Sequence, residues 1–234
     1  MILFAGLQLP ACASKPGPLG ERTIELDDFD FSTSISEILP ERYKHPKYDD
    51  CYQVPSADSG AGENIYSKDT RRDFYTDEFL WVEYKHTSRC WTDEYLSMAG
   101  RTFNAASFAT TSDGRIFAVG GCIDELTPAE NDDFIARLKK RYGEPVHAVE
   151  SFAKSDFDLY TWTLEDRTLE YAVVTTDESN VLKIELERNE AGELTDIRSG
   201  EQTTHLQSYF FVVDAAWKDR FTSGGRSGDF VYCR

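Results

Sequence analysis

The pattern of apolar positions is most regular between residues 128 and 142, where it has the period of an α-helix. One apolar stripe along this helix consists of Phe134, Leu138 and Tyr142. Thr127 and Glu130 have the spacing of a capping box, which satisfies free amide groups at the start of a helix. Gly143 and Pro145 follow the last apolar position and are typical of a helix end. The sequence therefore predicts the main helix in this segment.

Outside this helix the apolar period switches to two, which is the period of a β-strand. Segments rich in β-branched and aromatic residues, separated by polar turns, predict strands. These segments are residues 78–86, 103–110, 115–121, 147–152, 157–164, 168–175, 181–188, 194–198 and 209–213, with a short last strand at 230–233. Asp113-Gly114 lies between two of them and predicts a tight hairpin. Leu182, Ile184 and Leu186 alternate with charged residues, which indicates a sheet with one buried face.

These elements predict an α+β fold, with a largely antiparallel sheet packed against one main helix and short helices. The short helices are expected near residues 34–39 and 214–221. We expect a single α+β domain over residues 21–234, with a subdivision near residues 100–125 as the alternative. Residues 1–20 are interpreted as a separate anchor and tether.

The amino-terminal segment combines an apolar stretch, a cysteine and a proline-rich tether. Residues 1–11 carry no charged side chain, and a cysteine follows them directly. Leu9-Pro10-Ala11-Cys12 resembles the lipobox of bacterial lipoproteins, in which the signal peptide is cut before a cysteine that becomes lipidated. The resemblance implies a lipid on Cys12 and a periplasm-facing place in the bacterial cell envelope, with secretion as the alternative. The competing interpretation is a buried strand in which Cys12 is an ordinary small apolar residue.

A second resemblance covers roughly residues 125–188. Residues 142–145 read Tyr-Gly-Glu-Pro, and an apolar strand pair follows around residues 160–169. This order is similar to a helix, Tyr-Gly-x-Pro, strand, strand module of bacterial lipoproteins and secreted proteins. The resemblance implies a helix layered on an antiparallel sheet, in proteins thought to bind rather than to catalyse, and it implies no catalytic residue.

The five cysteines fit an exported protein. If Cys12 carries lipid, the remaining four can close two disulfides in an oxidising compartment. Three pairings are open, and we favour Cys51 with Cys90 and Cys122 with Cys233, because each pair then joins residues of one half of the chain. The cysteines and histidines do not have the spacing of zinc ligands, so we expect no metal site.

The charge balance narrows the range of partners. The chain has 25 Lys and Arg against 42 Asp and Glu, a formal net charge of −17, and a sequence pI near 4.6. Such a field repels nucleic-acid phosphates and anionic lipids and attracts basic proteins. We therefore expect no nucleic acid, a basic protein partner, and a membrane contact through the lipid anchor only. Solubility alone is the alternative explanation of the charge.

Sequence motifs for catalysis are missing. The chain has neither a Gly-x-Ser-x-Gly elbow nor the Gly-Lys-Ser/Thr of a P-loop. The glycine-rich residues 223–228 predict a flexible loop that presents Arg226. We therefore expect neither enzymatic activity nor a cofactor.

Together these features favour an envelope-anchored acidic binding protein. The specific hypothesis is an inhibitor or immunity protein against a basic secreted toxin or cell-wall hydrolase, with a loop at residues 55–62 or 223–228 that plugs a cleft. One alternative is a hydrolase or carbohydrate-acting enzyme with an undetected pair of carboxylates. The other is a structural envelope lipoprotein.

Overall fold

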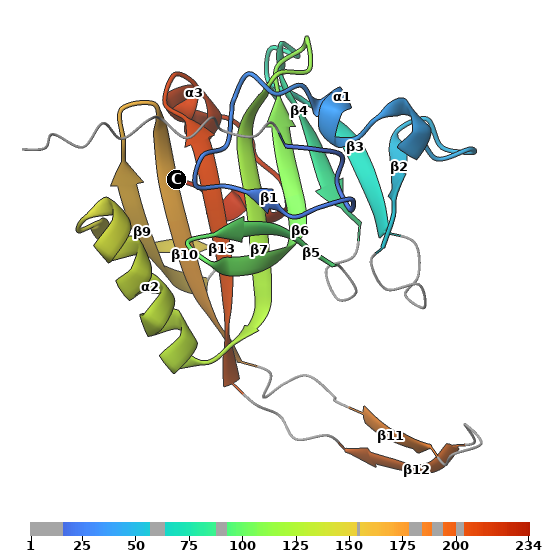
Figure 1. The fold of residues 1–234 in the computed structure, drawn as a ribbon, viewed down its shortest axis with the longest axis vertical. Coiled ribbons are helices and arrows are strands. Elements are labelled where there is room, and N and C mark those ends of the chain that lie inside the picture. Colours follow the sequence, from blue (N-terminus) through green and yellow to red (C-terminus); the bar gives the residue numbers. More distant parts are fainter. Residues whose placement is uncertain are drawn as a thin grey trace, which may run out of the picture.

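Figure 1 shows the fold in a computed structural model, which describes residues 16–56, 64–87, 93–153, 155–177, 184–188, 194–199 and 204–234. The strands are β1 (Ile24–Glu25), β2 (Cys51–Val54), β3 (Asn64–Arg72), β4 (Phe79–His86), β5 (Glu94–Met98), β6 (Arg101–Thr110), β7 (Ile116–Leu126), β8 (Val146–Phe152), β9 (Ser155–Thr163), β10 (Arg167–Asp177), β11 (Ile184–Arg188), β12 (Leu194–Ser199) and β13 (Thr204–Asp214). The α-helices are α1 (Ile35–Ile38), α2 (Pro128–Tyr142) and α3 (Lys218–Ser223), and the 3₁₀-helices are η1 (Glu41–Tyr43) and η2 (Gly228–Tyr232).

Within the described residues, eleven strands form one sheet. Its order is β2-β3-β4-β6-β7-β13-β10-β9-β8, while β5 pairs with β6 and β1 with β5. The pairs in this sheet are antiparallel except for the parallel pair of β1 and β5. The largely antiparallel sheet is therefore confirmed, and this sheet dominates a fold that has few helices.

The strands β11 and β12 form a second, two-stranded sheet of their own (Figure 1). The alternation at Ile184 and Leu186 predicted a sheet with one buried face. In the structure β11 pairs with β12 and with no strand of the main sheet among the described residues. Leu182 lies outside the described residues.

One face of the main sheet packs against α2. The helix begins with the predicted capping box, in which the Thr127 hydroxyl accepts from the backbone N–H of Glu130 at 3.3 Å. The ring of Phe134 meets the rings of Phe103 and Tyr171, with centroids 5.6 and 5.1 Å apart. These contacts join the helix to β6 and β10. The predicted helix over residues 128–142 is thus confirmed at both ends.

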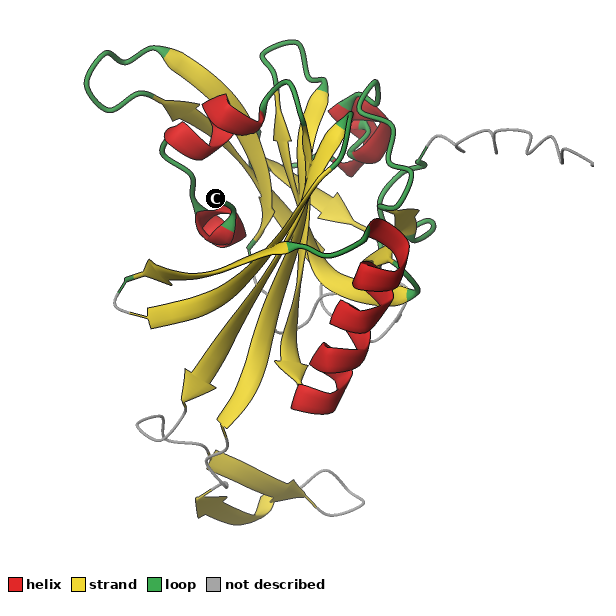
Figure 2. Ribbon diagram, turned by 90° about the vertical axis from the view of Figure 1, so that its left-hand side faces the viewer, coloured by secondary structure: helices red, strands yellow, loops and turns green. Residues whose placement is uncertain are grey.

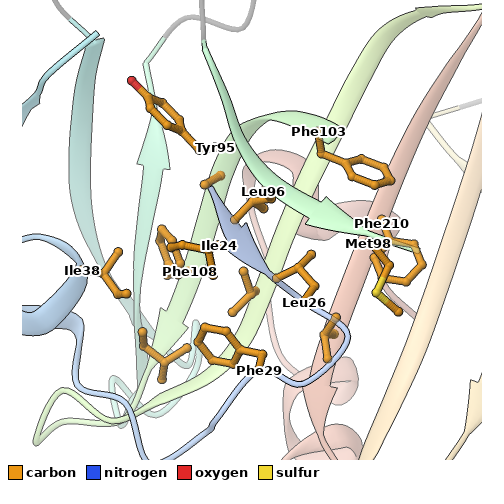
Figure 3. Packing of buried hydrophobic residues seen from close by; sticks show 14 of the residues in the cluster. Ile24, Leu26, Phe29, Ile38, Tyr95, Leu96, Met98, Phe103, Phe108 and Phe210 are labelled. Carbon is orange, nitrogen blue, oxygen red and sulfur yellow. The ribbon is translucent and has the colours of Figure 1, made fainter. Parts of the chain in front are cut away.

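The amino-terminal segment covers the same face beside α2. Ile24 on β1 lies opposite Leu96 on β5, and both side chains are buried. Figure 3 shows Leu26 and Phe29 in the same cluster, close to the sheet. The apolar residues between positions 19 and 43 therefore complete the larger of the two cores.

The opposite face of the sheet is covered by the carboxyl-terminal segment. Phe221 on α3 contacts Trp81 and Phe117, with ring centroids 5.1 and 5.3 Å apart. Phe230 on η2 contacts Phe221 and Phe211, at 5.2 and 5.8 Å. Figure 2 shows this carboxyl-terminal segment and the long helix α2 on opposite sides of the sheet. Residues 217–233, which we call the carboxyl-terminal cover, thus form the second core.

The end of the chain differs from the prediction. The apolar run at residues 230–233 predicted a strand, whereas the structure has the 3₁₀-helix η2 there. Phe230 and Cys233 are buried, and the backbone N–H of Cys233 donates to the carbonyl of Phe230. A short apolar run predicts burial but not its conformation, and here the run packs onto the face of the sheet instead of pairing with its edge.

Candidate functional site

Among the described residues, two neighbouring aromatic side chains project almost fully into solvent. Phe74 and Tyr75 lie at the turn between β3 and β4, and each is 91% exposed. Their rings meet edge to face, with centroids 5.3 Å apart and an interplanar angle of 87°. We call the turn over residues 73–78 the β3–β4 tip. Aromatic side chains dominate binding energy at protein interfaces, so this exposure indicates a contact surface.

The β3–β4 tip is closed by hydrogen bonds around Asp73. One carboxylate oxygen of Asp73 accepts from the backbone N–H groups of Tyr75 and Thr76, at 2.9 and 2.8 Å, and from the Thr76 hydroxyl at 3.0 Å. The backbone N–H of Asp73 donates to the carbonyl of Glu78 at 2.8 Å. Hydrogen bonds from Thr76 and Tyr75 lower the pKa of Asp73 from its ordinary value. The aromatic pair is therefore held on an ordered turn.

The far side of the tip is fixed by Arg72 and Asp77. Asp77 has a φ of 57°, in the left-handed region that few residues other than glycine and asparagine adopt. Arg72 donates to the carbonyl of Asp77 at 2.9 Å and lies 3.9 Å from its carboxylate. Residues 72–78 thus carry three carboxylates and one guanidinium, which makes this end of the hairpin acidic.

The base of the hairpin is attached to the carboxyl-terminal cover. Arg71 on β3 donates twice to the carbonyl of Gly225, from Nε at 3.0 Å and from Nη2 at 2.8 Å. The same guanidinium lies 3.2 Å from the carboxylate of Asp69. A guanidinium that donates two bonds to one acceptor fixes direction as well as distance, so the hairpin has a defined position over the cover.

A buried polar network makes a second attachment. The Glu83 side chain is fully buried and accepts from the Trp81 indole at 3.0 Å and from the Ser227 hydroxyl at 2.5 Å. Lys85 donates to Ser227 at 2.6 Å and to Asp69 at 3.3 Å, and it lies 3.6 Å from Glu83. Each buried charge therefore has a partner, which is the condition for a stable buried ion pair. We call this network the Glu83 latch.

The Glu83 latch also contains a serine beside a lysine, an arrangement known from nucleophilic catalysis. Here Lys85 pairs with two carboxylates and donates to Ser227, whereas a general base has to accept the hydroxyl proton. The geometry of Ser227 between Glu83 and Lys85 is therefore that of a structural tie between β4 and the carboxyl-terminal cover.

Two loops, at residues 55–62 and 223–228, were proposed from the sequence to plug a cleft of a partner, and the structure describes only the second in full. Residues 57–63 lie outside the described residues, and with them most of the loop at 55–62. The glycine-rich loop at 223–228 turns inward, because Arg226 is half-buried and donates to the carbonyl of Cys233. Burial lowers the pKa of the Arg226 guanidinium. The prediction that this loop presents Arg226 to solvent is therefore wrong.

The three described cysteines are not paired with one another. Cys51 on β2 is half-buried, Cys122 and Cys233 are buried, and these three form no disulfide in the described part of the chain. Cys12 and Cys90 lie outside the described residues. The lipid on Cys12 and the pairing of Cys51 with Cys90 therefore stay predictions.

The favoured pairing of Cys122 with Cys233 is not formed in the structure. The thiol of Cys233 faces the carboxylate of Glu170 on β10, and burial raises the pKa of this thiol well above its ordinary value. Cys122 lies on β7, and β13 runs between β7 and β10. Both cysteine side chains are buried in the core on the face of the sheet that the carboxyl-terminal cover closes.

Phe74 and Tyr75 were not among the residues predicted from the sequence, although a signal for them was present. The connection between the two strands is polar except for these adjacent aromatic residues, and buried aromatic residues do not belong in such a turn. Within the described residues, no group of three or more His, Cys, Asp or Glu side chains could hold a metal ion.

Comparison with known proteins finds no matching family model, no similar curated protein and no similar solved structure. None of the described helices is both long and apolar enough to cross a membrane. The β3–β4 tip, with its two attachments, is the feature of the described residues best suited to a molecular contact.

Proposed function

We propose that this chain is an acidic binding protein of the cell envelope, and that Phe74 and Tyr75 on the β3–β4 tip enter a cleft of its protein partner. The observation that carries the proposal is an aromatic pair, 91% exposed at each residue, on a turn closed by hydrogen bonds. An ordered turn loses little conformational freedom on binding, so more of the contact energy appears as affinity.

Electrostatics support a basic partner. Asp73, Asp77 and Glu78 share the turn with the aromatic pair, and the whole chain carries a formal charge of −17. Opposite charge on a partner raises the association rate and favours one orientation of approach. An inhibitor or immunity protein for a basic secreted toxin or cell-wall hydrolase has this combination of an acidic body and a projecting plug.

Two further parts of the proposal concern location and architecture. A lipid on Cys12 would place the protein at the envelope surface, where such a partner acts. We also assign the fold to the α+β class. The contacts of Phe134 with the sheet support this assignment, because they layer a helix on antiparallel strands.

The proposal can be tested with an aromatic-deletion variant, Phe74→Ala with Tyr75→Ala. Wild-type protein and the variant are immobilised and exposed to envelope extract of the source cells, and captured proteins are identified by mass spectrometry. The matched control is Tyr48→Ala, which removes another exposed aromatic ring, 62% exposed, from a different part of the surface. We expect a basic protein to be captured by the wild type and by the control but not by the double variant.

The affinity of the purified protein for its captured partner measures how much Phe74 and Tyr75 contribute to binding. A hot-spot aromatic residue contributes about 2 kcal/mol or more, so loss of one ring is expected to weaken binding by roughly 30-fold, and loss of both rings by more than that. Binding should also weaken with rising salt, because opposite charges are screened. Equal capture by all three proteins, or an affinity that does not change with salt, would contradict the proposal.

A further inference from the structure

A polar cavity lies away from the β3–β4 tip, between the turn that joins β5 to β6, the end of β7 and the helix α2. Its volume is about 690 Å³, and small-molecule sites have volumes of roughly 300–1,000 Å³. Arg101, Thr102 and Asn104 line it from β6, and Arg137 lines it from α2. We call it the Arg101 cavity.

The two arginines differ in their partners. Arg137 donates to the carbonyl of Ala99 at 2.9 Å, and its Nε, which is buried without a hydrogen bond like that of Arg101, lies 3.1 Å from the carboxylate of Asp133. The Arg101 side chain is only 16% exposed, its Nε is buried without a hydrogen bond, and its ion pair with Glu130 is long, at 3.9 Å. Among the described residues, no hydrogen bond is formed by any nitrogen of the Arg101 guanidinium.

This arrangement of Arg101 is costly without a ligand. A guanidinium carries five N–H donors, and a largely buried charge that lacks hydrogen bonds destabilises a protein. Buried polar groups of this kind call for a specific explanation. A ligand whose anionic group accepts from Arg101 supplies one, since the side chain lies at the wall of a cavity large enough to admit it.

The other charged groups of the cavity define the rest of the ligand. Glu94, Asp124 and Glu125 line the same space. Asp124 accepts from the Gln207 side-chain amide at 2.7 Å, which holds its carboxylate in place. These acids repel a doubly charged phosphate but attract an ammonium group. The planar fork of Arg101 matches a carboxylate.

We propose that the Arg101 cavity binds a small zwitterionic carboxylate, of the class of free amino acids and dipeptides. The ligand carboxylate accepts from Arg101, and its ammonium group faces Asp124 and the neighbouring acids. The hydroxyl of Thr102 and the amide of Asn104 offer further polar contacts at the same wall. This site is separate from the β3–β4 tip and does not depend on the protein partner proposed above.

Three probes separate the contributions of the two charges. Glycylglycine carries both, N-acetylglycine carries only the carboxylate, and glycinamide carries only the ammonium group. Each is titrated into the full chain at matched ionic strength, and backbone amide shifts are followed by NMR, with sodium chloride as the blank. We expect saturable shifts at residues 100–104 with glycylglycine, binding weaker by roughly tenfold with N-acetylglycine, and no saturation with glycinamide.

Arg101→Gln should abolish saturable binding of both carboxylate probes. The matched control is Arg220→Gln, which removes an exposed arginine on α3 and should leave binding unchanged. Because the Arg101 guanidinium has no hydrogen bond to lose, the Arg101→Gln variant should melt at the same temperature as the wild type or higher. Equal shifts with all three probes, unchanged binding in Arg101→Gln, or a lowered melting temperature of that variant would each overturn the proposal.

Discussion

The contact between Gly224 and Trp81 allows a sharp test of how the hairpin is attached to the carboxyl-terminal cover. Gly224 packs directly on the indole ring of Trp81, which is fully buried. A Cβ atom at Gly224 would lie within 3.0 Å of two carbons of this ring, a separation that real Cβ atoms essentially never show. In Gly224→Ala either the ring or the loop must therefore move.

The cost of this change follows from the surroundings of the ring. Trp81 packs against Phe221 and Phe117 and donates to Glu83, so a shift of the indole disturbs a core and the Glu83 latch together. Overpacking a closed core costs about 1–3 kcal/mol. For a chain of this length each kcal/mol lowers the melting temperature by about 2–4 °C. We expect Gly224→Ala to melt about 2–12 °C below the wild type.

The neighbouring glycine provides the control. Gly225 does not have a φ in the left-handed region, and an added Cβ would meet its nearest atom, Nη2 of Arg71, at 3.7 Å. Gly225→Ala should therefore be neutral, or stabilising by about 0.4–1 kcal/mol through the unfolded chain. Thermal unfolding is followed by circular dichroism, and tryptophan emission reports on the surroundings of the indole. Equal melting temperatures for Gly224→Ala and Gly225→Ala would refute the reasoning.

Three further outcomes are expected. Thr127→Ala removes the cap of α2 and should lower the free energy of unfolding by about 1 kcal/mol, measured by urea denaturation. Because the pKa of Asp73 is lowered in the folded turn, the turn is most stable above the ordinary pKa of an aspartate and loosens as pH falls through the lower folded value. The protection of the amides across the tip, measured as the ratio of intrinsic to observed hydrogen exchange, should then fall. Buried Cys122 and Cys233 should react with iodoacetamide only after unfolding, as peptide mapping would record.

Each of these outcomes has a result that contradicts it. A Thr127→Ser variant keeps a capping hydroxyl and should retain most of the stability, so equal losses in the serine and alanine variants would exclude the cap as the cause. In an Asp73→Asn variant the acid-induced change in exchange at the tip should disappear. Rapid labelling of Cys233 in the folded protein would show that the carboxyl-terminal cover does not protect it.

Elements with local cues could be predicted from the sequence. The capping box at Thr127 and Glu130 and the following glycine determine the ends of α2 within one turn of chain, and the structure agrees. The hairpin around Asp113-Gly114 also forms, because its turn and both flanking strands are adjacent in the sequence. In both cases the interactions that select the element join residues only a few positions apart.

The candidate site could not be predicted in the same way. The hydrogen bond of Glu83 with Ser227 joins residues 144 positions apart, and it becomes visible only when β4 and the carboxyl-terminal cover are known to share one face of the sheet. From the sequence pattern alone, Glu83 cannot be distinguished from the many other acidic residues of the chain. The aromatic tip was missed for another reason, since Phe74 and Tyr75 follow neither a helical period nor a strand period.

The separation of the two halves of the Glu83 latch has a consequence for biosynthesis. Closing a loop of 144 residues costs about 4 kcal/mol in chain entropy, so this contact forms late, after the sheet has brought its ends together. A growing chain that has not yet added Ser227 has its β3–β4 hairpin without the anchor at the base. A partner that binds through Phe74 and Tyr75, as proposed, would therefore meet a fully anchored hairpin only after residues 224–227 are in place.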